Sequence, residues 1–231
     1  FSILARQGSR LSQLRLRRGA SRLDDAQLAE LQQSHGLVSA TANPDAGGKD
    51  NSDFLASIND GIGLSVNLHA DGPDGIIGWR ARKHAGLIDI DKPASQPISR
   101  FWEAVRTDDL TGGGLVLNPD EFYILASREF VCVPSSYAAE MRAYDTRVGE
   151  FRAHYAGFFD PGFGMSDIGA APTRAVLEVR SHDVPFLIEH GQIVCRLVYE
   201  PMADVPEALY GAQGSGSNYQ SQGLKLAKHF C

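Results

Sequence analysis

Short apolar segments recur along this sequence from residue 63 onward, and Gly, Pro, Asp or Asn separates them. Apolar and polar residues alternate within several of them, as in GLSVNLHA (63–70), which is the pattern of a half-buried strand. Turn residues recur at intervals of roughly 8–12 positions, which is typical of an all-β sandwich or barrel. We therefore predict a mainly β fold with strands at 63–70, 75–82, 86–91, 114–119, 121–127, 129–134, 175–181, 184–191 and 192–201.

Helices are expected to be few and short. Residues 22–35 are predicted to form one, because Asp24 can cap its start and Gly36 can end it. Residues 99–105 are predicted to form a second, shorter helix. The stretch 39–53 is rich in Asn, Asp, Gly and Ala and is expected to be a surface loop.

Charge and composition narrow the class of function. The net charge of −6 argues against a nucleic-acid-binding surface. No apolar run approaches the ~18 residues of a membrane span, so no membrane segment is expected. The cysteines Cys132, Cys195 and Cys231 lack the spacing of zinc ligands, which argues against zinc. We expect a protein of the reducing cytoplasm.

An internal repeat bears on the domain organisation. When Gly8 is aligned with Gly191, both segments show apolar residues, a turn glycine and then alternating apolar residues, with Leu14 over Leu197. We therefore expect residues 1–20 to be the last strands of a truncated N-terminal domain of the same type. Residues 21–210 would form the main domain, and residues 211–231 an arm over the active site.

The segment HYAGFFDPGFG (154–164) places one carboxylate, Asp160, between aromatic residues and directly before Pro161-Gly162. The Pro-Gly pair predicts a β-turn. Asp160 could simply cap the backbone of that turn, or it could serve a ligand. Both interpretations remain open from the residues alone.

Glu178 is the second carboxylate of interest. Strict strand alternation places it on the same face as Val176. It could face solvent and pair with Arg174 or Arg180. Alternatively, it could be a general acid or base in a partly apolar pocket, with a pKa raised by desolvation.

Several other polar residues have two interpretations each. Arg142, Arg147 and Lys225 could position a phosphate, or they could be solvated surface charges. His154 could contact a ligand or be a structural histidine. No P-loop or GxGxxG pattern is present, which disfavours an ATP-driven or dinucleotide enzyme.

Two motifs together resemble a known family. AGFFDPGF (156–163) followed by AVLEV (175–179) resembles the core of the dCTP deaminase family, in the trimeric dUTPase-like, β-clip superfamily. YQSQG (219–223) resembles that family's tail motif, and the likeness runs from about residue 22 to the end. The doubled layout resembles the two-domain 2′-deoxycytidine 5′-triphosphate deaminases. The resemblance implies a dUTPase-like barrel or sandwich and a homo-oligomer, with a trimer as the default.

The resemblance also implies roles for individual residues. Phe163 would lie against the deoxyribose and Asp160 would accept a hydrogen bond from its 3′-hydroxyl. Glu178 would take a proton from the water that attacks C4 of cytosine, without zinc, and Mg²⁺ would accompany the triphosphate. The remaining substrate-binding residues would be Arg142, Arg147, His154, Ala156, Tyr219, Gln222 and Lys225.

One departure keeps the function open. Where the family has Arg-Ser-Ser-x-Gly-Arg, this chain reads RAYDTR (142–147), so Ala143 and Tyr144 replace both serines. The absent first domain could supply that motif and give a composite site. The expected activity is deamination of dCTP to dUTP in pyrimidine deoxynucleotide biosynthesis. The alternatives are a dUTPase, a bifunctional dCTP deaminase/dUTP diphosphatase, or a non-catalytic nucleotide-binding half.

Overall fold

A computed structural model describes residues 1–9, 14–43, 54–143, 151–154, 158–165, 171–181, 183–211 and 223–231. In chain order the elements are β1 (Ser2–Leu4), α1 (Asp25–His35), β2 (Val38–Ser39), β3 (Ile62–Asn67), β4 (Ile76–Ala81), β5 (Leu87–Asp89), α3 (Ile98–Phe101), β6 (Trp102–Arg106), the 3₁₀ helix η2 (Thr107–Asp109), β7 (Gly114–Leu117), β8 (Phe122–Val131), β9 (Tyr137–Ala143), β10 (Phe151–His154), β11 (Phe158–Phe159), β12 (Thr173–Ser181), β13 (Phe186–Glu189) and β14 (Ile193–Pro201). The predicted mainly β fold with a few short helices is confirmed.

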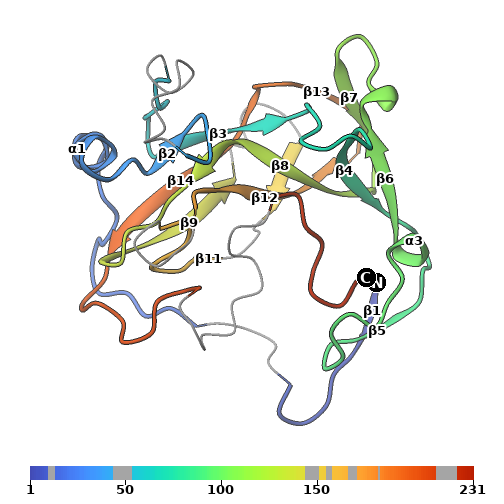
Figure 1. Ribbon diagram of the computed structural model, residues 1–231, viewed down its shortest axis with the longest axis horizontal. Helices are drawn as coiled ribbons and strands as arrows, with labels where there is room; N and C mark the ends of the chain where they lie inside the picture. The colour runs from blue at the N-terminus through green and yellow to red at the C-terminus, as the bar shows by residue number, and fades with distance from the viewer. Residues whose placement is uncertain are drawn as a thin grey trace.

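One antiparallel sheet organises the molecule. Its main path runs β10-β12-β8-β3-β14-β9-β11, and β2 and β4 also pair with β8. Figure 1 shows this sheet strongly curved, with α1 beside β2 at one end. Two smaller pairs complete the fold, β13 with β7 and β1 with β5, the latter parallel. Among the described residues, no helix is long and apolar enough to span a membrane.

Helix α1 forms because both of its ends are capped by side chain and backbone. The Asp24 carboxylate accepts a hydrogen bond from Gln27 N, and the Gln27 side chain accepts one from Asp24 N, which is a capping box. Gly36 ends the helix in the left-handed conformation and donates its N–H to Gln32 O. Leu28 and Leu31 are buried against the core. The helix predicted at 22–35 is therefore confirmed, although it begins at Asp25.

The second predicted helix, 99–105, is mostly wrong. Only Ile98–Phe101 is helical, and Trp102–Arg106 is strand β6, which pairs with β4. Trp102 is buried in that strand. Aromatic and β-branched residues such as Trp102 and Val105 fit a pleated, half-buried surface, so tertiary pairing decides this segment.

Two segments predicted as separate strands, 121–127 and 129–134, form the single strand β8. The polar residues Ser127 and Glu129 between them are buried. Ser127 Oγ donates to Glu129 O and accepts from Ala175 N, so its polar atoms are satisfied inside the sheet. A polar interruption therefore does not end the strand.

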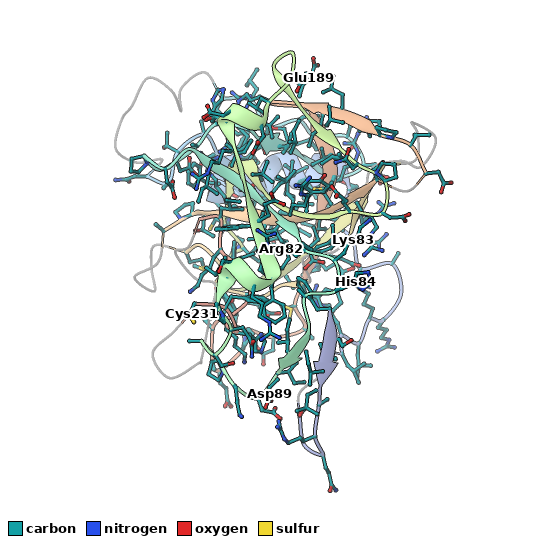
Figure 2. All side chains as sticks on the ribbon, turned by 90° about the vertical axis from the view of Figure 1, so that its right-hand side faces the viewer. Arg82, Lys83, His84, Asp89, Glu189 and Cys231 are labelled. Carbon is teal, nitrogen blue, oxygen red and sulfur yellow. The ribbon has the colours of Figure 1, made fainter. Side chains whose placement is uncertain are left out.

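The N-terminal residues depart from the predicted pair of strands. β1 pairs with β5, and Arg6 makes a bidentate bond to Asp89, which is labelled in Figure 2. Residues 14–18 lie in the segment expected to hold the last strands of an N-terminal domain, and they form no strand. The usual burial of apolar side chains is reversed here. Leu14 and Leu16 are 89% and 96% exposed, whereas the Arg15 side chain is only 14% exposed. The assignment of residues 1–20 to a separate domain stays a prediction.

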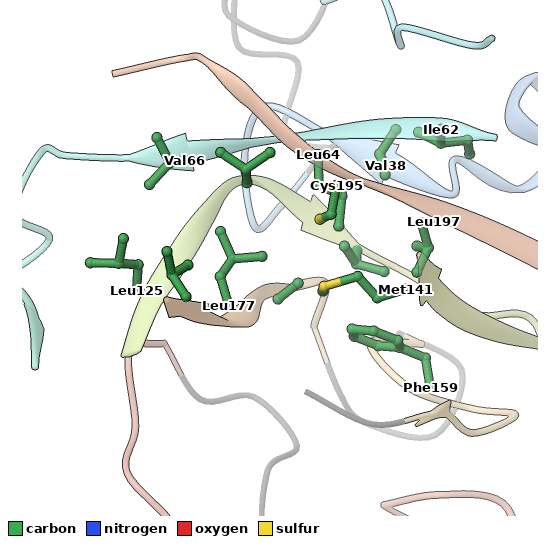
Figure 3. Close-up of a cluster of buried hydrophobic side chains, with 14 of the residues drawn as sticks. Val38, Ile62, Leu64, Val66, Leu125, Met141, Phe159, Leu177, Cys195 and Leu197 are labelled. Atoms are coloured by element: carbon green, nitrogen blue, oxygen red, sulfur yellow. The ribbon is translucent and has the colours of Figure 1, made fainter. Parts of the chain in front are cut away.

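Strand β12 separates two apolar clusters. Ala175, Leu177 and Val179 are fully buried in the first cluster, whose packing around Leu177 is visible in Figure 3. Val176, on the opposite face, packs against the second cluster, which contains Ile124. Both faces of β12 therefore pack against apolar residues, although Arg180 near its end is exposed.

The described C-terminal residues, 223–231, pack against the second cluster. Leu226 is buried in the second cluster, and Leu224 and Phe230 pack against it. A parallel bridge joins Phe230 to Gln96. Residues 223–231 therefore cover the same cluster that Val176 of β12 touches.

A steric prediction follows from Gly164. Its φ of +69° is left-handed, and a Cβ there would overlap the carbonyl oxygen of Val131. Gly19 has the same φ of +69° with no atom near an added Cβ. We expect Gly19→Ala to cost about 1 kcal/mol of unfolding free energy through backbone strain alone. Gly164→Ala should cost at least about 2 kcal/mol more because the overlap adds to the strain. Chemical denaturation measures both, and equal losses would contradict the steric contact.

Candidate active site

Glu178 lies in the middle of β12, between strands that pair with it on both sides. In the sheet it lies opposite His154 of β10 and Ile124 of β8. Ile124 in turn lies opposite Trp79 on β4. Because side chains alternate along a strand, Glu178 shares the face of Val176 and not that of the first cluster. The half-buried carboxyl group therefore lies beside an apolar cluster.

No described residue forms an ion pair or side-chain hydrogen bond with Glu178. The arginines that could have paired with it are used elsewhere: Arg174 forms a bidentate bond to Asp71, at 2.9 and 3.0 Å. Arg180 lies 5.7 Å from the centre of the Phe122 ring. The interpretation of Glu178 as a surface ion-pairing residue is therefore not supported by the described contacts.

Desolvation by burial raises the pKa of Glu178 from 4.5 to about 7. Burial disfavours the charged form of an acid, and no described cation offsets it. A carboxyl group with a pKa close to neutral pH can both accept and release a proton. The site can thus support general acid–base chemistry, and the catalytic role of Glu178 stays a prediction.

The Asp160 turn has the predicted form. Phe163 N donates to Asp160 O at 3.1 Å, and Gly162 has a φ of +97°, which with Pro161 before it gives a type II turn. Two backbone bonds join the turn to Val133: Gly162 N donates to Val133 O, and Val133 N donates to Phe163 O. The turn is therefore fixed to the end of β8.

Phe163 is 7% exposed and belongs to the first cluster. Its ring makes an edge contact with Phe159, with centroids 5.1 Å apart, and lies 5.9 Å from Tyr210. Asp160, by contrast, keeps 31% of its side chain exposed. The turn thus combines a packed aromatic ring with an accessible carboxylate.

Sequence reasoning missed Arg15, which reaches the same turn. Arg15 Nη2 lies 3.7 Å from Asp160 Oδ1, and its guanidinium carbon lies 4.0 Å from the centre of the Phe158 ring. Arg15 Nη1 donates to Ala139 O at 3.2 Å. Residues 1–20 were expected to belong to another domain, so no residue among them was considered. The alternation of arginine with leucine at 14–17 was the available signal.

The other predicted site residues do not gather around Glu178 within the described part of the chain. Arg142 Nη1 bonds to Asp60 Oδ2 at 3.1 Å on an exposed surface. Lys225 is exposed. The backbone of His154 lies beside Glu178 in β10, but its side chain is outside the description. The predicted residues that lie outside the described residues altogether are Arg147, Ala156, Tyr219 and Gln222.

The described residues contain no group of three or more His, Cys, Asp or Glu side chains that could hold a metal ion. The three cysteines are free thiols. No resident metal or cofactor is therefore assigned to the described site.

Comparisons with known proteins agree on one family. The family described as "2′-deoxycytidine 5′-triphosphate deaminase (DCD), C-terminal domain" matches residues 24–230. A solved 2′-deoxycytidine 5′-triphosphate deaminase from Agrobacterium tumefaciens is 46% identical with a TM-score of 0.69, covering 82% of this chain and 51% of that one. This match supports the predicted dUTPase-like class of fold.

Curated relatives are more distant. The "dCTP deaminase, dUMP-forming" of Methanobrevibacter smithii is 30% identical over 136 residues, which cover 58% of this chain and 65% of the relative. The protein of the same name from Methanothermobacter thermautotrophicus is 28% identical over 145 residues, covering 59% of this chain and 68% of the relative. The chain thus spans about two thirds of these relatives and about half of the solved protein.

The raised pKa of Glu178 predicts a pH-dependent effect on stability. Between pH 4.5 and about 7 the unfolded chain loses this proton before the folded chain does, so the folded state loses stability as pH rises. Glu178→Gln removes that titration. Full linkage would give about 3 kcal/mol, and solvent screening of this half-buried group reduces it, so the variant should gain roughly 1–2 kcal/mol of unfolding free energy relative to the unaltered protein as pH rises from 4.5 to 8.

Denaturation midpoints at several pH values measure this gain. Glu189→Gln is the matched control, because Glu189 is exposed on β13 at the surface of the molecule (Figure 2). A Glu178→Gln effect that stays constant over this pH range would contradict the raised pKa.

Proposed function

This chain belongs to the 2′-deoxycytidine 5′-triphosphate deaminase (DCD) family, and on that basis we propose that it deaminates dCTP by hydrolysis. The observation that carries the proposal is Glu178, a half-buried carboxyl group without a described partner and with a pKa of about 7. It is the glutamate of AVLEV (175–179), the segment that resembles the family's core motif. Groups with such perturbed pKa values cluster at functional sites.

The proposed mechanism uses Glu178 as a general base and then as a general acid. Ionised Glu178 accepts a proton from a water molecule while the water oxygen forms a bond to C4 of cytosine. The carboxyl group passes this proton to N3 of the ring, which completes the tetrahedral intermediate. The carboxylate then accepts the proton of the new C4 hydroxyl and transfers it to the amino nitrogen, so that the C4–N bond breaks, ammonia leaves and the uracil carbonyl forms. A pKa near the working pH suits both transfers. We propose that no zinc takes part.

The Asp160 turn supports the proposed substrate class. We propose that the ring of Phe163 packs against deoxyribose, where a 2′-hydroxyl would have no room, and that Asp160 accepts a hydrogen bond from the 3′-hydroxyl. The buried ring and the accessible carboxylate at one turn suit these two roles. Mg²⁺ would arrive with the triphosphate, bound through phosphate oxygens and water.

The product is a separate question. Both curated relatives named above carry the words "dUMP-forming", which favours a second candidate, a bifunctional deaminase and diphosphatase. In that case pyrophosphate would be released together with ammonia. A monofunctional enzyme would stop at dUTP, and a non-catalytic nucleotide-binding half would release neither.

We further propose a cytoplasmic homo-oligomer, with a trimer as the default, acting in the supply of dUTP and dTTP without nucleic-acid or membrane partners. Arg142, Arg147, His154, Ala156, Tyr219, Gln222 and Lys225 stay proposed as substrate-binding residues. Arg142 keeps 36% of its side chain exposed, so a neighbouring copy could reach it. Size measurement in solution tests the assembly directly.

Glu178→Gln should lower ammonia release from dCTP about 10²–10⁴-fold, which is the contribution of a positioned general base. Binding of dCTP should persist, because glutamine has the same shape. Ammonia and pyrophosphate are followed separately in the full-length protein with Mg²⁺ and a zinc chelator, and Glu189→Gln serves as the control. Full turnover by the Glu178→Gln variant would show that Glu178 is not the general base.

The pH dependence of kcat/KM gives an independent prediction. The base must be ionised in the free enzyme, so kcat/KM for dCTP should rise with pH through about 7 and then level off. The profile is measured by ammonia release across that range. A rise centred near the ordinary pKa of glutamate, 4.5, would mean that the desolvated carboxyl group is not the rate-determining base.

A further inference from the structure

We propose that Arg15 is a positioning residue that holds Asp160 in place for the sugar of the bound deoxynucleotide. The inference rests on the proposed function and deepens it. It adds a residue from the N-terminal segment to a site whose other proposed residues all follow Glu140 in the sequence. Arg15 is not proposed to contact the reacting atoms.

Arg15 contacts three parts of the site at once. Its guanidinium group lies over the Phe158 ring, faces the Asp160 carboxylate at 3.7 Å and donates to the carbonyl oxygen of Ala139. Phe158 and Asp160 belong to β11 and the turn after it, whereas Ala139 belongs to β9. One cation thus ties the turn to the neighbouring strand of the sheet, by cation–π, ionic and hydrogen-bonding contacts.

The segment that carries Arg15 is itself anchored. Arg17 Nε donates to Glu200 Oε2 at 2.7 Å, and Arg17 Nη2 bonds to Glu140 Oε2. Both carboxylates are almost fully buried, at 4% and 8% exposure for Glu200 and Glu140. Buried carboxylates need a charged or hydrogen-bonding partner, so these bonds fix the segment on β9 and β14. Leu23 N also donates to Tyr199 O, which secures the end of the segment.

The contact leaves Asp160 able to serve a ligand. A separation of 3.7 Å is an ion pair without a hydrogen bond. A carboxylate has about four acceptor positions, and the Arg15 contact occupies none of them with a hydrogen bond. Two backbone bonds join the turn to Val133, and the contacts of Arg15 with Phe158 and Asp160 add to the restraint on the turn and on the Asp160 side chain.

The test compares Arg15→Gln, Arg15→Lys and the control Arg18→Gln in the full-length protein. Arg18 is exposed on the same segment, and no described ion pair involves it, so the control removes the same charge without the contacts. The kinetic constants are measured for dCTP and for 2′,3′-dideoxycytidine triphosphate. Because the analogue lacks the 3′-hydroxyl, the difference between the two substrates gives the contribution of that group. Hydrogen exchange at the amides of Gly162 and Phe163, without nucleotide, reports on the turn independently of activity.

Arg15→Gln should raise KM for dCTP about tenfold and change kcat less than about threefold, since one hydrogen bond to a charged group is weakened. The preference for dCTP over the dideoxy analogue should fall by the same factor, and Arg15→Lys should recover part of it. Exchange at Gly162 and Phe163 should become faster in Arg15→Gln only.

An unchanged preference for the 3′-hydroxyl in Arg15→Gln would overturn the inference. So would an equal effect of Arg18→Gln, which would mean that charge alone matters. If the unaltered protein releases no ammonia from dCTP, the proposed function is wrong. In that case the exchange measurement still decides the role of Arg15 at the turn: faster exchange in Arg15→Gln supports it, and equal exchange overturns it.

Discussion

The two apolar faces of strand β12 are the constraint on which the rest of the structure depends. β12 pairs with β8 from Thr173 to Arg180 and with β10 from Glu178 to Ser181. Ala175, Leu177 and Val179 are buried in the first cluster, and Val176 packs against the second. Glu178, on the face of Val176, is half-buried in these surroundings. Burial makes the charged form of the Glu178 carboxyl group less favourable and so raises its pKa. A pKa near neutral pH suits proton transfer at that pH.

The two proposed functional carboxylates are set apart by their surroundings. Glu178 is desolvated and has no described cationic partner, which favours its neutral form. Asp160 lies on a solvent-accessible turn, 3.7 Å from the guanidinium group of Arg15. Two groups of the same chemistry can therefore take different tasks, one as a proton carrier and one as a fixed hydrogen-bond acceptor.

Local chemistry made parts of the fold predictable from the sequence. The cap at Asp24, the glycine end at Gly36 and the Pro161-Gly162 turn each have a short-range cause, and the structure contains all three. The shared face of Val176 and Glu178 followed from the period of a strand. The sequence did not predict which apolar residues lie on that face, because Ile124 and Leu226 come from distant parts of the chain.

The failures came from long-range contacts. Trp102–Arg106 becomes a strand because β4 offers it a pairing partner. Residues 14–18 turn arginine inward because Asp160, Glu140 and Glu200 lie beneath them, and no local pattern reveals carboxylates so far away in the sequence. β9 has an alanine-rich sequence with little strand propensity and is held by β14 and β11. The contact of Arg15 with the site was missed for the same reason.

The most direct test of this account is a titration of the Glu178 carboxyl group itself. Carbon-13 NMR of the protein labelled at glutamate side-chain carboxyls, with Glu178→Gln used to assign the resonance, gives its pKa without any assay of turnover. The account predicts a midpoint of about 7, well above the 4.5 expected of an unperturbed glutamate. A midpoint close to 4.5 would mean that Glu178 is solvated or paired, and would contradict the proposal that its desolvated carboxyl group activates water.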